Sequence, residues 1–139
     1  MSETPVARHL RANIFPALTY RDAHAAIDWL VEAFGFEARA VHEGPDNTVG
    51  HAELALGPGV VMLGSVKEHL FNQKPPKEAG ISTQTIYVYV ADADAHYERA
   101  MAAGAEVIRA LQTTDHGSRE YSVRDPEGHV WSFGTYLPE

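Results

Sequence analysis

A histidine and a glutamate stand two residues apart in the segment VGHAELAL. Side chains of a β-strand alternate between its two faces, so Val49, His51 and Glu53 are expected on one face. Ala52 and Leu54 then form the apolar opposite face, which belongs under a helix. His51 and Glu53 are therefore candidate catalytic residues, either as a general acid and base or as half of a displaced metal site. The alternative is a hydrated strand face with an incidental ion pair.

A second group of side chains suited to binding lies in the segment TQTIYVYVA. Thr85, Tyr87 and Tyr89 alternate there with the aliphatic Ile86 and Val88. Two tyrosine rings on one strand face could stack on a planar or cationic ligand while their hydroxyls hydrogen-bond to it. The alternative is that these rings pack at a sheet edge or in a dimer interface.

The chain that carries these residues is acidic, with 11 Lys plus Arg against 19 Asp plus Glu and a net charge of -8 over 139 residues. This balance disfavours nucleic acid as a partner, because phosphate binding needs clustered positive charge. No apolar run approaches the ~20 residues that span a bilayer, so no membrane partner is expected. The chain contains no cysteine, which excludes disulfides, thiol catalysis and thiolate metal sites. Its N-terminal segment has no apolar stretch of signal-peptide length, so a cytoplasmic location is the default expectation. A small-molecule ligand is the expected partner.

The elements that must position these residues occur twice along the chain. Asp22 precedes the helical pattern AHAAIDWLVEAFG, and Asp92 precedes ADAHYERAMAAG. Each aspartate is placed to cap the start of its helix, and Gly35 and Gly104 are placed to end the helices in a left-handed conformation. Short segments rich in β-branched and aliphatic residues surround both helices. The sequence therefore predicts an α+β fold, with two β-α-β-β-β modules side by side in a single domain, residues 1–139.

The module boundaries follow from turn signals and composition. Module one is expected at about 12–66 and module two at about 84–137. The turns GPG at 57–59 and DPEG at 125–128 each join the last two strands of a module. The segment 67–83 carries adjacent prolines and no clear periodicity, which indicates a linker, and we expect it to lie over the site.

The segments DAHAAIDWLVEAFGFE in the first module, and AGAEV with VRDPEGHVWSF in the second, resemble the vicinal oxygen chelate superfamily. This superfamily includes glyoxalase I, extradiol dioxygenases, fosfomycin-resistance enzymes and bleomycin-resistance binding proteins. The resemblance extends over about residues 12–136. It implies two modules whose sheets curl around a cleft, with the helices on the outer face, and many members are homodimers. Because members range from isomerases to drug-sequestering proteins without catalysis, the resemblance specifies the fold more closely than the function.

The metal-dependent members of this superfamily hold a divalent ion with His, Gln or Glu side chains from the first and fourth strands of both modules. The corresponding positions here carry Phe15, Met62 or Leu63, Thr85 and Ser132. Hard divalent cations need several carboxylate or imidazole groups, so this set would not hold one against water. A register slip of one residue would bring in a single ligating side chain, that of Gln84. The resemblance therefore implies a protein without the metal and without another cofactor.

The residues left in the cleft form the predicted ligand-binding site. If Phe15 and Thr85 face the cleft, alternation places both tyrosines of the segment TIYVY there as well. The internal repeat makes Glu120 and Ser122 the counterparts of His51 and Glu53. The predicted ligand-binding set is Phe15, His51, Glu53, Thr85, Tyr87, Tyr89, Glu120 and Ser132.

Three functions from different classes fit these residues. The first is a glyoxalase/bleomycin-resistance-like protein that lacks the usual metal ligands and binds a small aromatic or cationic molecule. The second is a lyase, isomerase or dioxygenase-type enzyme, with a shifted metal site or with metal-free acid/base chemistry by His51 and Glu53. The third is a regulatory or interaction module with a vestigial cleft. A homodimer is expected, since modules of this kind expose sheet edges that association would cover.

Overall fold

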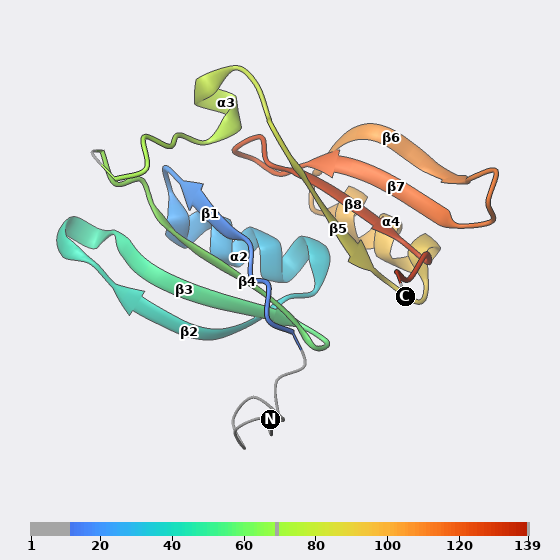
Figure 1. Cartoon of the computed structure of the whole chain (residues 1–139), viewed down its shortest axis with the longest axis horizontal. Coiled ribbons are helices and arrows are strands. Elements are labelled where there is room, and N and C mark those ends of the chain that lie inside the picture. The colour runs from blue at the N-terminus through green and yellow to red at the C-terminus, as the bar shows by residue number, and fades with distance from the viewer. Residues whose placement is uncertain (1–11, 69, 139) are drawn as a thin grey trace, which may run out of the picture.

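The computed structural model describes residues 12–68 and 70–138, and it confirms the α+β fold of two β-α-β-β-β modules (Figure 1). The first module consists of β1 (Ala17–Tyr20), α2 (Ala23–Phe34), β2 (Glu37–Glu43), the 3-10 turn Pro45–Asn47, β3 (Val49–Leu56) and β4 (Gly59–Ser65). The linker contains the short helix α3 (Pro76–Ala79). The second module consists of β5 (Thr85–Tyr89), α4 (Ala93–Ala102), β6 (Glu106–Thr113), β7 (Arg119–Arg124) and β8 (Val130–Gly134).

Each module forms one four-stranded sheet, with the order β1-β4-β3-β2 in the first and β5-β8-β7-β6 in the second. The first strand of each module is parallel to its neighbour, and the other pairs are antiparallel. Helices α2 and α4 cover the same side of the two sheets, behind them in Figure 1, and the opposite side of each sheet carries no helix of its module. We call this opposite side the open face.

The helices begin and end where the sequence predicts. The Asp22 carboxylate accepts a hydrogen bond from the Ala25 amide at 3.1 Å, and the Asp92 carboxylate accepts one from the Ala95 amide at 3.0 Å. Gly35, with φ of 84°, ends α2 in the left-handed region that favours glycine. Among the helices of the described chain, none is long and apolar enough to cross a membrane.

One apolar core lies between the helices and both sheets. Leu18, Trp131 and Phe133 point into it and are at most 4% exposed, as strand alternation predicts. The ring of Phe34, near the end of α2, lies 5.4 Å from that of Trp131 and 4.6 Å from that of Phe133. Residues of module one and module two therefore pack against each other, so the two modules share a core.

His96 adds a polar contact between the modules within this core. Its Nε2 lies 2.8 Å from the Phe34 carbonyl oxygen, so Nε2 carries the proton and donates it. Its Nδ1 then accepts from the Tyr121 hydroxyl, 2.6 Å away. Burial lowers the pKa of the His96 imidazole, which favours the neutral form that this arrangement needs.

Asp125 is the centre of the junction between the modules. This carboxylate is 4% exposed and opens the turn before β8. Its Oδ2 accepts hydrogen bonds from the Tyr20 hydroxyl of module one at 2.6 Å and from the Trp131 indole at 3.1 Å. Its Oδ1 accepts from the backbone amides of Glu127 and His129 at 3.0 and 3.1 Å. Four donors compensate for the burial of this charge, and one of them comes from the other module.

The rest of the same turn extends the junction. The Glu127 carboxylate accepts the backbone amides of Arg21 and Asp22, and so satisfies two donors at the start of α2. The His129 Nε2 donates to the Thr19 carbonyl oxygen at 2.8 Å. The segment DPEG, which the sequence predicts only as a turn between strands, therefore also binds the end of β1.

Replacing Asp125 by asparagine should destabilise the protein by roughly 3 kcal/mol. A carboxylate has two oxygens that accept hydrogen bonds, whereas a carboxamide has one, so the donors that face the new amide nitrogen would lose their acceptor. The measurement is urea unfolding at neutral pH. Asp115→Asn, an exposed carboxylate in the turn after β6, is the matched control and should stay within about 0.5 kcal/mol of the parent. An equally small effect of Asp125→Asn would show that the junction does not depend on this carboxylate.

Candidate functional site

The open faces of the two sheets carry the side chains that the core does not use. On β1, Leu18 and Tyr20 are buried in the core, whereas Ala17 and Thr19 lie on the open face. On β5, Tyr87 pairs with Ser132 of β8, and both lie opposite the core residues Trp131 and Phe133. Strand alternation therefore predicts correctly which side chains of β1, β5 and β8 lie on the open face and which lie in the core.

His51 and Glu53 form a pair on the open face of the first sheet. The His51 Nε2 lies 2.9 Å from a Glu53 carboxylate oxygen, and the two side chains are 41% and 45% exposed. Met62 of β4 is the cross-strand partner of Glu53, and Ala17 is the partner of Met62. His42 on β2 stacks on His51 with ring centroids 6.0 Å apart. The pair therefore has the geometry of an imidazole oriented by a carboxylate, at a surface open to water.

Val49 does not share the face of His51, contrary to the expectation from alternation. It is 1% exposed and belongs to the core. The register between β2 and β3 shifts here, since His42 pairs with His51 while the next residue, Glu43, pairs with Val49. Gly50 is the extra residue of a β-bulge, which turns Val49 towards the core.

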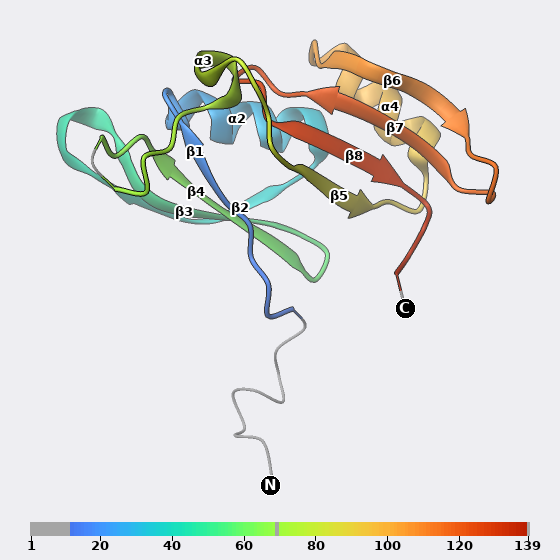
Figure 2. The same cartoon turned by 45° about the horizontal axis from the view of Figure 1, so that its top comes forward.

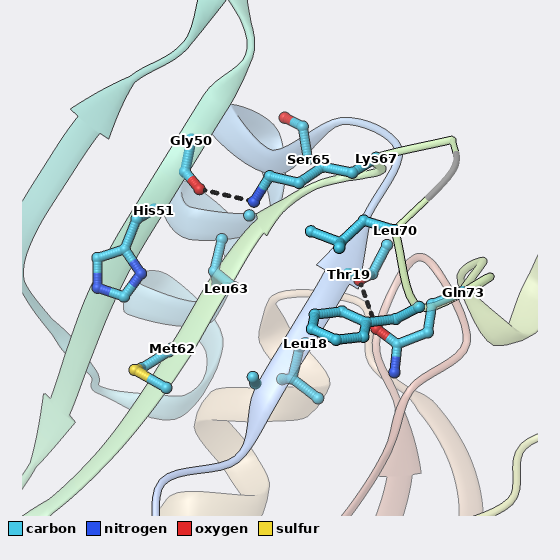
Figure 3. A pocket seen from close by; sticks show the side chains of 13 residues that line it. Leu18, Thr19, Gly50, His51, Met62, Leu63, Ser65, Lys67, Leu70 and Gln73 are labelled. Carbon is cyan, nitrogen blue, oxygen red and sulfur yellow. Dashed lines mark hydrogen bonds between the residues drawn. The ribbon is translucent and has the colours of Figure 1, made fainter.

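The linker runs beside the open face of the first sheet and encloses a cavity of about 130 Å³ (Figure 3). The walls of this cavity come from β1, the start of β3, β4 and four residues of the linker, with His51 at one side; the linker residues are Lys67, Leu70, Phe71 and Gln73. Leu70 and Phe71 contribute apolar side chains from the linker, and Thr19 donates to the Gln73 amide oxygen at 3.4 Å. Figures 1 and 2 show the linker continuing past the end of β1 to α3 and then to β5.

Two contacts hold the linker in place. The Arg21 guanidinium donates to both oxygens of Glu78 at 2.8 and 2.7 Å, and also to Glu68 at 3.3 Å. These hydrogen bonds lower the pKa of the Glu78 carboxyl. The Lys77 backbone amide donates to the Glu127 carbonyl oxygen at 2.9 Å, which joins the linker to the junction turn. The start of the linker and α3 are thus bound to the loop after β1, and α3 is also bound to the turn before β8.

The open face of the second sheet carries a connected polar cluster. The Ser122 and Ser132 hydroxyls lie 2.6 Å apart. The Arg109 guanidinium donates to Glu120 at 3.0 Å and lies 3.5 Å from the Ser122 hydroxyl. The Tyr87 hydroxyl donates to the Tyr136 carbonyl oxygen at 2.6 Å. This face therefore presents a fixed array of hydroxyl, guanidinium and carboxylate groups.

The side chains of this cluster are packed closely together. Glu120 is 8% exposed, and its carboxylate has one hydrogen bond recorded in the described residues, from Arg109. Partial burial raises the pKa of the Tyr87 hydroxyl, and the negative charge of Glu120 raises it further. A Cβ added to Gly134 would lie 2.6 Å from the Glu120 Cγ and 2.8 Å from the Tyr87 hydroxyl. The absence of a side chain at Gly134 therefore lets the ring and the carboxylate approach each other.

The predicted site residues fall into separate groups. Tyr87, Glu120 and Ser132 lie together on the second sheet, whereas His51 and Glu53 lie on the first. The other three are Phe15, Thr85 and Tyr89, of which Thr85 and Tyr89 flank Tyr87 on the same face of β5. Phe15 precedes β1 and is 37% exposed, Thr85 begins β5, and Tyr89 ends β5 near the start of α4 with 45% exposure.

Arg109 and Gly134 contact the cluster on the second sheet but were not among the predicted residues. Two register irregularities in β6 determine which side chain of that strand meets Glu120, so alternation alone could not identify Arg109. A signal for Gly134 existed, because a glycine inside the segment VWSFG indicates a bulge or a close approach.

The residues of this chain do not fit the divalent-metal site that metal-dependent members of the superfamily have. Leu63 is 3% exposed in the core, so Met62 is the fourth-strand residue on the open face of the first sheet. Its counterpart on the second sheet is Ser132, which is hydrogen-bonded to Ser122. Across residues 12–68 and 70–138, the structure gathers no group of three or more His, Asp or Glu side chains that could hold a metal ion. We therefore derive no chemistry from a bound metal.

Comparisons with known proteins agree with this architecture. The family model of the glyoxalase/bleomycin resistance protein/dioxygenase superfamily matches residues 10–133. Uncharacterized protein Mb0911c of Mycobacterium bovis is 36% identical over 136 residues, which cover 96% of this chain and 90% of that protein. The crystal structure of TioX from Micromonospora superposes with a TM-score of 0.74 at 36% identity, covering 91% of this chain and 99% of that one. FosX, a fosfomycin resistance protein of Mesorhizobium loti, shares the fold at 16% identity, with a TM-score of 0.66 and coverage of 91% and 93%.

The purified protein should contain no stoichiometric divalent metal, because Met62 and Ser132 offer no ligand that competes with water. Elemental analysis, with melting curves before and after treatment with a chelator, checks this. About one zinc, nickel, manganese or iron per chain, whose removal lowers the melting temperature, would contradict the prediction.

Proposed function

Because the chain belongs to the glyoxalase/bleomycin resistance protein/dioxygenase superfamily, we propose that it binds a small planar aromatic molecule on its open faces and performs no metal-dependent step. The observation that carries the proposal is the pair of residues at the fourth-strand positions. Met62 and Ser132 supply a thioether and a hydroxyl there, which suit contact with an organic molecule better than coordination of a hard cation.

The cluster around Tyr87 supports an aromatic ligand. Its hydroxyl is fixed by the Tyr136 carbonyl oxygen, so the ring is held in one orientation before a ligand arrives. A preorganised ring loses little conformational entropy on binding. Stacking contributes ~1 kcal/mol beyond the burial of apolar area at ~25 cal/mol per Å², which is sufficient for micromolar affinity for a flat molecule.

The charges on the open face of the first sheet favour a cationic or neutral ligand over an anion. Glu53 is half-exposed beside Met62, whereas the buried Glu120 of the second sheet is paired with the Arg109 guanidinium. The chain as a whole has a net charge of -8, which attracts cations over longer distances. Affinity for a cation should therefore decrease as the salt concentration increases.

A second candidate function is favoured by the His51 and Glu53 pair. The 2.9 Å contact orients the imidazole, and a carboxylate-oriented imidazole is the usual arrangement of a general base. Acid/base chemistry on a bound substrate, as in a lyase or an isomerase, is the alternative that this geometry supports.

A thermal-shift screen of planar cationic and neutral aromatic compounds tests the binding proposal. Tyr87→Ala should weaken a hit by about tenfold, since a stacked ring with its buried area contributes roughly 1–2 kcal/mol. Tyr87→Phe keeps the ring and should retain most of the affinity. Glu53→Gln should weaken cationic hits and leave neutral ones unchanged, with the exposed Glu37→Gln of β2 as the matched control.

Hits that keep their affinity in both Tyr87→Ala and Glu53→Gln would contradict the proposed binding face. Conversion of a hit to a product by the parent protein, lost in His51→Ala while binding remains, would replace the binding function with the enzymatic one.

We also propose that the protein is a homodimer. The outer strands β2 and β6 are sheet edges, and Val41, Val107 and Ile108 on them are 40–43% exposed. Exposed apolar edges are usually covered by association. Light scattering should give the mass of two chains at micromolar concentration, and a monomer mass throughout that range would contradict the proposal.

A further inference from the structure

Four neighbouring side chains form a row across the open face of the second sheet. Tyr87 of β5 pairs with Ser132 of β8, Ser132 pairs with Ser122 of β7, and Ser122 pairs with Arg109 of β6. The two large side chains belong to the outer strands of the sheet, and the two serines belong to the inner strands (Figure 1). The row therefore has an aromatic ring at one end, a guanidinium at the other and short hydroxyl side chains between them.

The Arg109 guanidinium reaches inward from its outer strand over β7. Its Nη2 donates to the Glu120 carboxylate at 3.0 Å and lies 3.5 Å from the Ser122 hydroxyl, and both of these residues belong to β7. Neighbouring strands of a sheet are about 4.8 Å apart, so two strand spacings, or about 10 Å, separate the guanidinium from Tyr87 on β5. Ser132 lies beneath this interval, and a flat molecule of two fused rings that contacts Tyr87 at one edge spans it.

Arg109 keeps hydrogen-bond donors for a ligand. Within the part of the chain that the structure describes, both of its side-chain contacts use Nη2, so the N–H groups of Nε and Nη1 have no protein acceptor there. The side chain is 39% exposed, so a ligand can reach these donors. Pairing with the nearly buried Glu120 also holds the planar guanidinium in one orientation before a ligand binds.

The pair of Arg109 and Glu120 determines which charge a ligand can carry at this end of the row. The two opposite charges cancel, so this part of the face has no net charge to attract an ion. A ligand carboxylate at Arg109 would lie close to the Glu120 carboxylate, and the two like charges would repel each other. A cation would be repelled by the guanidinium itself. A neutral oxygen acceptor, such as a ring carbonyl, meets neither cost and accepts a charge-assisted hydrogen bond.

We propose that Arg109 is the specificity-determining residue of the open face of the second sheet, and that it selects neutral, flat, fused-ring molecules with a carbonyl oxygen on the ring. This inference rests on the proposed function, because it names the ligand class of that same site. The rings lie over Ser132 with one edge against Tyr87, and the carbonyl oxygen accepts from Arg109. Glu53 on the first sheet favours cations over anions without excluding neutral molecules, so this ligand class is compatible with both open faces.

The test uses the full chain and four flat probes of two fused rings: chromone, naphthalene, 2-naphthoate and the cation 1-methylquinolinium. Binding is measured by titration in amide NMR spectra, where shifts of the Ser122 and Ser132 amides report the location. Chromone should bind about tenfold more tightly than naphthalene, which corresponds to the lower end of the contribution of a hydrogen bond to a charged group. The naphthoate and the quinolinium should bind this row no more tightly than naphthalene.

Arg109→Lys keeps a positive charge beside Glu120 but removes the planar fork of N–H donors. It should weaken chromone binding by about tenfold and leave naphthalene binding unchanged. Arg119→Lys is the matched control, because Arg119 belongs to the same sheet, is 38% exposed and is also paired with a carboxylate. Its partner Asp94 belongs to α4, on the helix side of the sheet, so the control should leave both affinities unchanged.

If Arg109→Lys does not fold, the double variant Arg109→Met with Glu120→Gln removes both charges of the pair and should give the same selective loss of chromone binding. Two results would overturn the role of Arg109 and leave the open-face site intact: chromone binding no tighter than naphthalene binding, or an equal loss of chromone affinity in Arg109→Lys and Arg119→Lys. Failure of all four probes to bind would instead contradict the proposed function, and this inference with it.

Discussion

The buried carboxylate of Asp125 is the interaction on which the arrangement of the two modules depends. A charge that is 4% exposed is costly unless it is fully hydrogen-bonded, and its fourth donor is the Tyr20 hydroxyl at the end of β1. Burial raises the pKa of that hydroxyl, and the neighbouring negative charge raises it further, so Tyr20 remains a donor at every physiological pH. The same turn binds the start of α2 and the linker, so the positions of β1, α2 and α3 relative to β8 follow from one contact region.

One face of each sheet packs in the shared core. The two open faces that remain differ from each other in their side chains. On the second sheet, Ser122, Ser132, Arg109 and Glu120 satisfy one another and leave few free groups. On the first sheet, His51 and Glu53 remain half-exposed, and the linker adds a wall that the second sheet does not have. The repeat in the sequence therefore produces two sheets of equal topology but unequal chemistry.

The local features of this fold were predictable because they depend on neighbours in the sequence. The caps Asp22 and Asp92, and the alternation on β1, β5 and β8, follow from helical and strand periodicity alone. Features that depend on partners distant in the sequence were not. The bulge at Gly50 reverses the orientation of Val49, and the acceptor role of Asp125 requires a donor 105 residues away. Tertiary contacts of this kind leave no periodic signal in the chain.

The distance in sequence between Tyr20 and Asp125 also affects how the chain folds during synthesis. Local contacts form early, whereas contacts between distant residues wait for the closing of a long loop. On a ribosome, Tyr20 and the first turn of α2 emerge while the turn that satisfies them has yet to be made. Until the last strand is released, the nascent chain exposes the apolar side of its first sheet and helix, and this is the stage at which it would need protection by chaperones.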